Sequence, residues 1–265
     1  MASADALGAW RTGDLFADRE GMRAWQLAIS YTHAESGIYD ITQGKSEKFP
    51  RLLGLLREKR PVTVVSYGDS ITYGWAASGM QDIRKPPHCR PYAQMIVDAL
   101  AEKYGAPVGH VNCSVSGKCT DWAELDENVA GVIGAKPDLV ILAFGMNDAG
   151  VFRPEVFAEK LRGIMRKIRN ACPHTEFLLI SPILPNPLVA FTAGSSIRRY
   201  HREYPRALLA VERETEGAAC ANVTAVHELL LERKSLQDTL SNNVNHPNDF
   251  MHRVYAEDAL KTLLA

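Results

Sequence analysis

The residues in this chain best suited to chemistry lie in the stretch Gly68-Asp69-Ser70-Ile71-Thr72. This stretch follows a run of strand-forming residues, 62–67. A serine placed where a buried strand ends projects its hydroxyl into a crevice at the edge of the sheet, which is where open α/β sheets bind ligands. A serine hydroxyl alone is a poor nucleophile. Catalysis at Ser70 therefore also needs a base, a group that orients the base, and donors for an oxyanion.

The segment 246–252 near the end of the chain supplies a candidate base and its orienting group. Asp249 and His252 are three residues apart, a spacing that places both side chains on one side of the first turn of a helix. We predict that Asp249 holds one imidazole nitrogen of His252 and that the other nitrogen accepts the Ser70 proton.

Two other interpretations fit the same segment. In the first, Asp249 caps the last helix and His252 is a surface histidine. In the second, His246, Asp249 and His252 bind a metal ion, although no further ligand cluster accompanies them. Apart from that site, His246 is interpreted as a turn or rim residue.

Two loops that follow further strand-like runs carry candidate oxyanion donors. Gly117 ends one of them, and its lack of a side chain lets its backbone N–H approach a ligand closely. Asn147 lies in the other, and its side-chain amide is able to donate to a developing oxyanion. Each also has a structural interpretation, as a turn glycine and as an Asx turn or helix cap. Because parallel strands end at one edge of a sheet, we expect both loops to lie near Ser70.

Five short apolar runs predict buried parallel strands over 62–67, 108–113, 139–144, 177–181 and 223–226. Helical patterns cover 91–103, 154–170, 195–216 and 254–264, with a kink or break expected at Pro205. This alternation predicts one three-layer α/β/α domain with helices on both faces of a five-stranded parallel sheet.

The predicted domain boundaries separate two parts of the chain. We place the three-layer domain at 49–265 and interpret 1–48 as an N-terminal extension to which the sequence assigns no role. Within this extension, 18–29 has a helical pattern and 38–42 a strand-like one.

Composition excludes several classes of function. The chain has 265 residues, 46% hydrophobic and 23% charged, with a formal net charge of −1. Those values are ordinary for a globular protein and give no basic surplus for nucleic acid or an anionic membrane. No run approaches the roughly 18 apolar residues that span a bilayer. We therefore expect no nucleic-acid or membrane partner and no cofactor, and the oligomeric state stays open.

The cysteines and the N-terminus bear on the compartment. Five cysteines without a C-x-x-C pair predict free thiols and a reducing compartment, although Cys113 and Cys119 are close enough in sequence for a bridge. No signal-peptide pattern is visible at the N-terminus. We expect a cytoplasmic protein, with a secreted or periplasmic one as the alternative if a signal peptide has been removed.

As a set, these segments resemble the blocks of the SGNH, or GDSL, hydrolase superfamily of esterases and lipases. The first block looks like 68–72, and the second contributes a glycine that matches Gly117. The third, glycine-x-asparagine-aspartate, matches 145–148, and the last, aspartate-x-x-histidine, matches 249–252. The resemblance covers roughly residues 61–265.

The resemblance implies a flavodoxin-like sheet, commonly in strand order 2-1-3-4-5, and a serine esterase. It implies Ser70 as the nucleophile, and an oxyanion hole formed by the Ser70 and Gly117 backbone N–H groups and the Asn147 amide. In the implied two-step mechanism, His252 deprotonates Ser70 and an acyl-enzyme forms. Activity should then fall on acidification, as His252 becomes protonated.

The expected substrate is a small-molecule or oligosaccharide ester. Tyr73 and Trp75 lie close to Ser70 in sequence, and aromatic faces stack on sugars as readily as they complete a core. With Met146, they are the candidate substrate contacts. The sequences of these segments look most like those of carbohydrate O-deacetylases of the superfamily. The alternatives are a short-chain lipid esterase, thioesterase or lysophospholipase, and a non-catalytic carbohydrate-binding relative.

Overall fold

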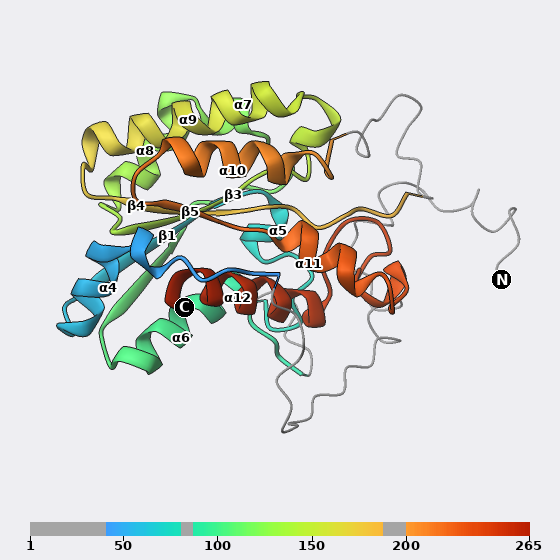
Figure 1. Ribbon diagram of the computed structural model, residues 1–265, viewed down its shortest axis with the longest axis horizontal. Coiled ribbons are helices and arrows are strands. Elements are labelled where there is room, and N and C mark those ends of the chain that lie inside the picture. Colours follow the sequence, from blue (N-terminus) through green and yellow to red (C-terminus); the bar gives the residue numbers. More distant parts are fainter. Residues whose placement is uncertain (1–40, 81–86, 188–199) are drawn as a thin grey trace, which may run out of the picture.

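A parallel sheet of five strands forms the centre of the protein (Figure 1). The computed structural model describes residues 41–80, 87–187 and 200–265. The strands are β1 (Val62–Gly68), β2 (Val108–Asn112), β3 (Leu139–Ala143), β4 (Glu176–Ile180) and β5 (Ala218–Ala221). Their order is β2-β1-β3-β4-β5, and every neighbouring pair is parallel. The predicted sheet and its strand order are confirmed.

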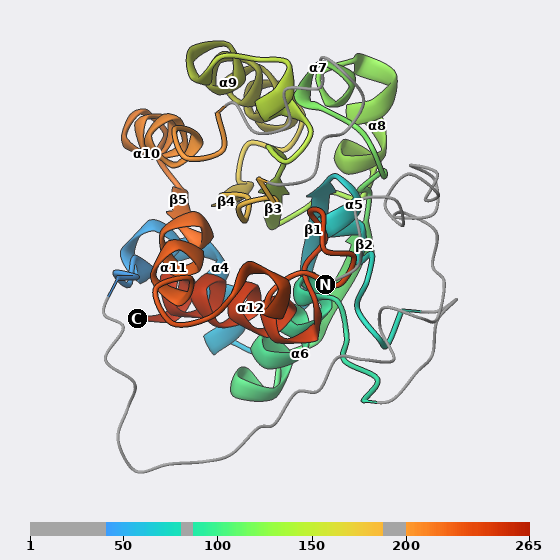
Figure 2. The same cartoon turned by 90° about the vertical axis from the view of Figure 1, so that its right-hand side faces the viewer.

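Helices cover both faces of the sheet (Figures 1 and 2). One face packs against α4 (Pro50–Arg57), α6 (Tyr92–Tyr104), α11 (Val223–Leu230) and α12 (Asp249–Leu264). The other packs against α7 (Thr120–Ala123), α8 (Asp126–Gly134), α9 (Pro154–Ala171) and α10 (Tyr204–Glu214). Each face buries its own apolar cluster, so the protein has the predicted three-layer α/β/α architecture.

Strand β1 reads as a continuous apolar run because both of its faces are buried. Val64 packs in the cluster beneath α4, α6 and α12, whereas Val65 and Tyr67 pack in the cluster beneath α8, α9 and α10. The strand ends at Gly68, where a Cβ atom would lie 2.3 Å from both the Ala143 carbonyl oxygen and Thr72 Oγ1. Glycine is therefore required for the close turn that leads out of the sheet.

The fifth strand is not where the apolar run 223–226 predicts it. Those residues form the first turn of α11, and the strand is the preceding Ala218–Ala221. Asn222 explains the switch, because its side chain accepts the N–H of Ala225 and so caps the helix at that point. Of the predicted helix over 195–216, residues 195–199 lie outside the described residues, 200–203 form a turn, and α10 covers Tyr204–Glu214. Within the described residues, Pro205 lies in the first turn of α10 rather than at a kink.

The described part of the predicted extension packs against the last helices. The Lys45 ammonium lies 2.7 Å from a Glu212 carboxylate oxygen. The backbone N–H of Lys45 donates to the Thr262 carbonyl at 2.9 Å. Thr42 donates a hydrogen bond to Asp258 of α12. A short 3₁₀ helix, η1 (Ser46–Lys48), then leads into α4. The helical pattern at 18–29 lies outside the described residues, and the division at residue 48 stays a prediction.

Two features of the chain bear on its compartment. All five cysteines are free thiols, so Cys113 and Cys119 are not bridged. Among the described residues, no helix has both the length and the apolar character needed to cross a bilayer.

Asp258 makes the stability of this packing depend on pH. Burial raises its pKa from 3.8 to about 7, against the opposing effect of Lys261 and Lys45. The folded protein therefore keeps a proton that the unfolded chain releases between about pH 4 and about pH 7. The stabilisation is present at low pH and is lost as pH rises through that window.

We predict that Asp258→Asn loses less stability than the wild type on going from about pH 5 to about pH 8. The amide oxygen still accepts the Thr42 hydroxyl, but nothing ionises there. Urea unfolding at the two pH values measures the difference for each protein. An equal loss of unfolding free energy in both proteins would contradict a raised pKa at Asp258.

Candidate active site

Ser70 lies at the carboxyl end of β1, as the first residue of the short helix α5 (Ser70–Tyr73). The Asp69 side chain caps that helix by accepting the Ile71 N–H at 2.9 Å. Neighbours of β1 lie on its two sides, because the chain runs from β1 to β2 on one side and then to β3 on the other. Ser70 therefore projects at the topological switch point, where open α/β sheets bind ligands.

The histidine that meets Ser70 is His246. Its Nε2 atom lies 2.9 Å from Ser70 Oγ, a hydrogen-bond distance. The Trp75 ring lies beside the imidazole, with ring centroids 6.3 Å apart. Both Ser70 and His246 are largely buried, so the contact is shielded from bulk water. Sequence reasoning interpreted His246 as a turn or rim residue and did not pair it with Ser70.

His252, the predicted base, lies elsewhere. It is fully buried, its Nδ1 accepts the Tyr92 N–H at 3.4 Å, and its Nε2 lies 3.2 Å from the Trp75 carbonyl oxygen. A neutral imidazole with its proton on Nε2 satisfies both backbone groups. The structure thus directs both ring nitrogens of His252 at the backbone and not at Ser70.

Asp249, the predicted orienting group, accepts the backbone N–H of Ser78 at 2.8 Å. It is the first residue of α12, after the N-cap Asn248. The spacing of three does place Asp249 and His252 toward the same segment, as predicted. That segment, however, is the loop 75–78, which the two side chains fasten to the start of α12.

A tight turn positions His246. The Asn242 side-chain oxygen accepts the backbone N–H groups of Val244, Asn245 and His246, each at 3.0 Å. The Asn242 side-chain nitrogen lies 2.8 Å from His246 Nδ1. The run of turn-forming residues before His246 is the sequence signal that indicates this turn. Counted back three residues from His246, the aspartate of the family pattern is replaced by Asn243.

The two loops with predicted oxyanion donors gather beside Ser70. The Val115 N–H donates to the Gly68 carbonyl at 3.0 Å, which fastens the loop after β2 to the end of β1. Gly117 in that loop has φ +75°, in the left-handed region that favours glycine. Asn147 donates one amide N–H to the Lys118 carbonyl at 3.1 Å, so the loop after β3 joins the same cluster.

Asp148 clamps these loops from below. Its carboxylate accepts the Thr120 N–H at 2.7 Å, the Thr120 hydroxyl at 2.6 Å and the Gly145 N–H at 3.1 Å. Burial nevertheless raises its pKa to about 6. Burial, with a contribution from the Asp148 charge, raises the pKa of Asp69 to about 7. Two carboxyls with raised pKa values therefore lie beneath the site, where a proton on either one relieves the cost of buried charge.

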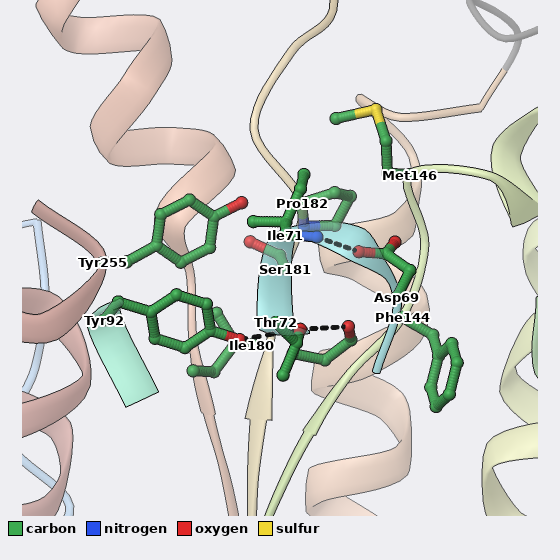
Figure 3. A pocket seen from close by; sticks show the side chains of 11 residues that line it. Asp69, Ile71, Thr72, Tyr92, Phe144, Met146, Ile180, Ser181, Pro182 and Tyr255 are labelled. Carbon is green, nitrogen blue, oxygen red and sulfur yellow. Dashed lines mark hydrogen bonds between the residues drawn. The ribbon is translucent and has the colours of Figure 1, made fainter. Parts of the chain in front are cut away.

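The predicted substrate contacts divide into two kinds. Tyr73 is 42% exposed, and Trp75 is half-buried beside His246. Met146 is only 1% exposed, and it lines a small pocket together with Asp69 and Tyr255 (Figure 3). Its carbonyl is hydrogen-bonded to His201 Nε2 at 3.0 Å. Met146 is thus part of the packing under the site, whereas Trp75 lies beside His246 and Tyr73 is exposed.

Residues 66–254 match the model of the GDSL-like lipase/acylhydrolase family, well over half of the chain. The chain belongs to this family. It is accordingly a carboxylic ester hydrolase, as the family resemblance implied. A comparison with curated protein sequences gives no match.

Solved structures of esterases share the fold. An acetylxylan esterase from Geobacillus stearothermophilus superposes with a TM-score of 0.60 at 18% identity, covering 77% of this chain and 94% of that one. A putative GDSL-like lipase from Parabacteroides merdae gives 0.62 at 15% identity, covering 85% and 99%. A two-domain esterase active on acetylated mannans gives 0.61 at 18% identity over 82% of this chain. The match covers only 53% of that longer esterase.

We predict that His252→Ala destabilises the fold while leaving the reactivity of Ser70 largely in place. The substitution leaves the Tyr92 N–H and the Trp75 carbonyl without their partner, at a cost of about 1–3 kcal/mol for each buried group. Urea unfolding measures the first effect, and mass spectrometry of a serine-directed organophosphonate adduct measures the second. Unchanged stability with lost labelling would instead support the pairing of His252 with Ser70.

Proposed function

We propose that this esterase removes short acyl groups, acetyl above all, from a carbohydrate, with Ser70 as nucleophile and His246 as its proton-transfer partner. The observation that carries the proposal is the 2.9 Å contact between Ser70 Oγ and His246 Nε2 at the carboxyl edge of the sheet. A serine, a histidine and nearby N–H donors are what acyl transfer through a covalent intermediate requires.

The proposed reaction has two steps. Ser70 Oγ gives its proton to His246 and attacks the ester carbonyl carbon, and the carbonyl oxygen becomes an oxyanion that accepts hydrogen bonds from the Ser70 and Gly117 N–H groups and the Asn147 amide. The C–O bond to the alcohol breaks, and the alcohol leaves with the proton that His246 returns. Water then attacks the acyl-enzyme, which releases the acid and returns the proton to Ser70. Loss of one oxyanion donor costs on the order of 10²–10³ in turnover.

The carbohydrate part of the proposal rests on the rim of the site. Trp75 lies beside the catalytic candidate His246, and Tyr73, three positions after Ser70 in the chain, is 42% exposed. Flat aromatic faces suit the apolar face of a sugar ring. The acetyl part draws support from structures of the same fold, which are described as esterases of acetylxylan and of acetylated mannans.

A lipid ester or thioester is the second candidate substrate. One observation favours it, a pocket beyond the carboxyl end of β4. Its lining combines apolar residues with polar and charged ones: Leu184, Pro185, Pro187, Leu231, Leu236, His201, Arg202 and Glu203. Such a surface is able to hold an alkyl chain, and its burial would contribute about 25 cal/mol per Å².

We predict that Ser70→Ala abolishes hydrolysis of p-nitrophenyl acetate and that His246→Ala lowers kcat by about 10²-fold or more. His252→Ala serves as the matched control, because the ring nitrogens of His252 lie against the Tyr92 N–H and the Trp75 carbonyl and not against Ser70. Melting temperatures of all three variants show whether each is folded. Full activity in folded Ser70→Ala would overturn the nucleophile assignment, and inactivity of the wild type would favour a binding protein.

We predict that acetylated xylan, mannan and pectin oligosaccharides are hydrolysed with a higher kcat/KM than C2 to C12 acyl esters of p-nitrophenol. Acetate release measures the first group and absorbance the second. Trp75→Ala should raise KM for the oligosaccharides more than for p-nitrophenyl acetate, because only the former offer a sugar face. A preference for long acyl chains, together with indifference to Trp75, would favour the lipid alternative.

A further inference from the structure

We propose that a pocket next to the Ser70 site binds a sugar unit of the alcohol part of the ester, and that His201 accepts a hydrogen bond from one of its hydroxyls. The inference rests on the proposed function, which it extends from the reacting atoms to the part of the substrate that leaves. The pocket has a volume of about 330 Å³, which is in the range of small-molecule sites. Its lining is partly apolar and partly polar: Leu184, Pro185, Pro187, His201, Arg202, Glu203, Leu231 and Leu236.

Two hydrogen-bonded connections place this pocket next to the reacting groups. His201 Nε2 lies 3.0 Å from the carbonyl oxygen of Met146, in the loop after β3 that carries a candidate oxyanion donor. On another wall, Asn186 lies between the two lining prolines, and its backbone N–H donates to the Val244 carbonyl at 2.7 Å. Val244 belongs to the turn that positions His246. The pocket is therefore bounded by segments that are fastened to the oxyanion loop and to the histidine turn.

The hydrogen bond to Met146 fixes which ring nitrogen of His201 carries the proton. A carbonyl oxygen only accepts, so Nε2 must donate, and a neutral imidazole then has its lone pair on Nδ1. Burial lowers the pKa of His201 to about 4, so the ring is neutral near pH 7. Within the described residues, His201 Nδ1 is a buried atom with no hydrogen-bond partner. Because His201 lines the pocket, a ligand there is in position to supply the donor.

The walls of the pocket favour a sugar over an alkyl chain. The lining leucines and prolines offer apolar surface to the C–H face of a sugar ring, and an alkyl chain would use that surface equally well. An alkyl chain, however, has no donor for His201 and would cover its lone pair without a partner, which weakens binding. A sugar unit supplies both an apolar face and hydroxyl donors. Glu203, an exposed lining residue, offers a carboxylate to a second hydroxyl.

The test is His201→Gln, measured on two substrates. The glutamine NH₂ group takes the place of Nε2 and still donates to the Met146 carbonyl, whereas nothing replaces the lone pair of Nδ1. We expect KM for acetylated xylo- and manno-oligosaccharides to rise by about tenfold relative to KM for p-nitrophenyl acetate, which has no sugar, because one hydrogen bond contributes up to about that factor in affinity. An equal rise of KM for both substrates, or a loss confined to kcat, would overturn the proposal and leave His201 as a packing residue of the oxyanion loop.

His174→Gln is the matched control. It makes the same replacement at an exposed histidine that precedes β4, at the amino edge of the sheet and therefore opposite Ser70. The ratio of the two KM values should stay at its wild-type value in this variant. A change of the ratio as large as that in His201→Gln would contradict a local effect at the pocket.

Binding of the free sugar gives a readout without hydrolysis. Xylotriose, mannotriose and sodium hexanoate, an alkyl chain without a donor, are titrated separately into Ser70→Ala while ¹H–¹⁵N spectra follow the ring nitrogens of His201. The proposal requires a trisaccharide to shift the Nδ1 resonance and hexanoate to leave it in place. An equal shift with hexanoate, or no shift with either trisaccharide, overturns it. If His201→Gln does not fold, this titration decides.

The same titration separates the failure of this inference from the failure of the proposed function. Esterase activity retained in folded Ser70→Ala would sink the proposed nucleophile, yet a trisaccharide shift at His201 would still establish the sugar site. Inactive Ser70→Ala without such a shift would remove the sugar site alone.

Discussion

The contact between Ser70 and His246 joins residues that lie 176 positions apart in the chain. It exists because two separate turns, one after β1 and one before His246, hold the two side chains in place. Gly68 lets the chain turn sharply out of β1, which positions Ser70. The turn at Asn242, near the end of the chain, positions His246. The alternating burial of β1 in two apolar clusters keeps the end of that strand rigid.

Elements with strong local signals were predictable from sequence. Apolar runs predict the first four strands, and periodic apolar faces predict the helices α6 and α9. The parallel order follows from the alternation of strands and helices. The fifth strand was placed wrongly because Ala218–Ala221 has small side chains and therefore a weak apolar signal. The next residues are more apolar, but they form a helix whose N-cap is Asn222. The apolar pattern therefore predicted a strand at the larger side chains, whereas the capping hydrogen bond of Asn222 starts a helix there.

Ser70 and the loops after β2 and β3 lie at the carboxyl edge of the sheet, but the histidine that contacts Ser70 is not the one that the sequence analysis paired with it. A spacing of three does put Asp249 and His252 on one side of α12, yet spacing says nothing about what lies opposite that side. In the structure it is the backbone of loop 75–78 and of Tyr92. His246 gave no periodic signal because it lies in a turn, where only the hydrogen bonds of Asn242 fix its direction. Direction of this kind is a property of the folded turn and not of residue spacing.

An amide and a carboxylate are nearly the same shape, so the turn before His246 depends on the oxygen of the residue at position 242. Both present an oxygen to the three N–H groups of the turn, so the fold accepts either residue at position 242. They differ at the second atom, which is a donor in one and an acceptor in the other. The two buried carboxyls beneath the loops, Asp69 and Asp148, are committed to other partners, Asp69 to α5 and Asp148 to the loops that carry Gly145 and Thr120. The direction of the His246 imidazole is instead set by the turn that carries it.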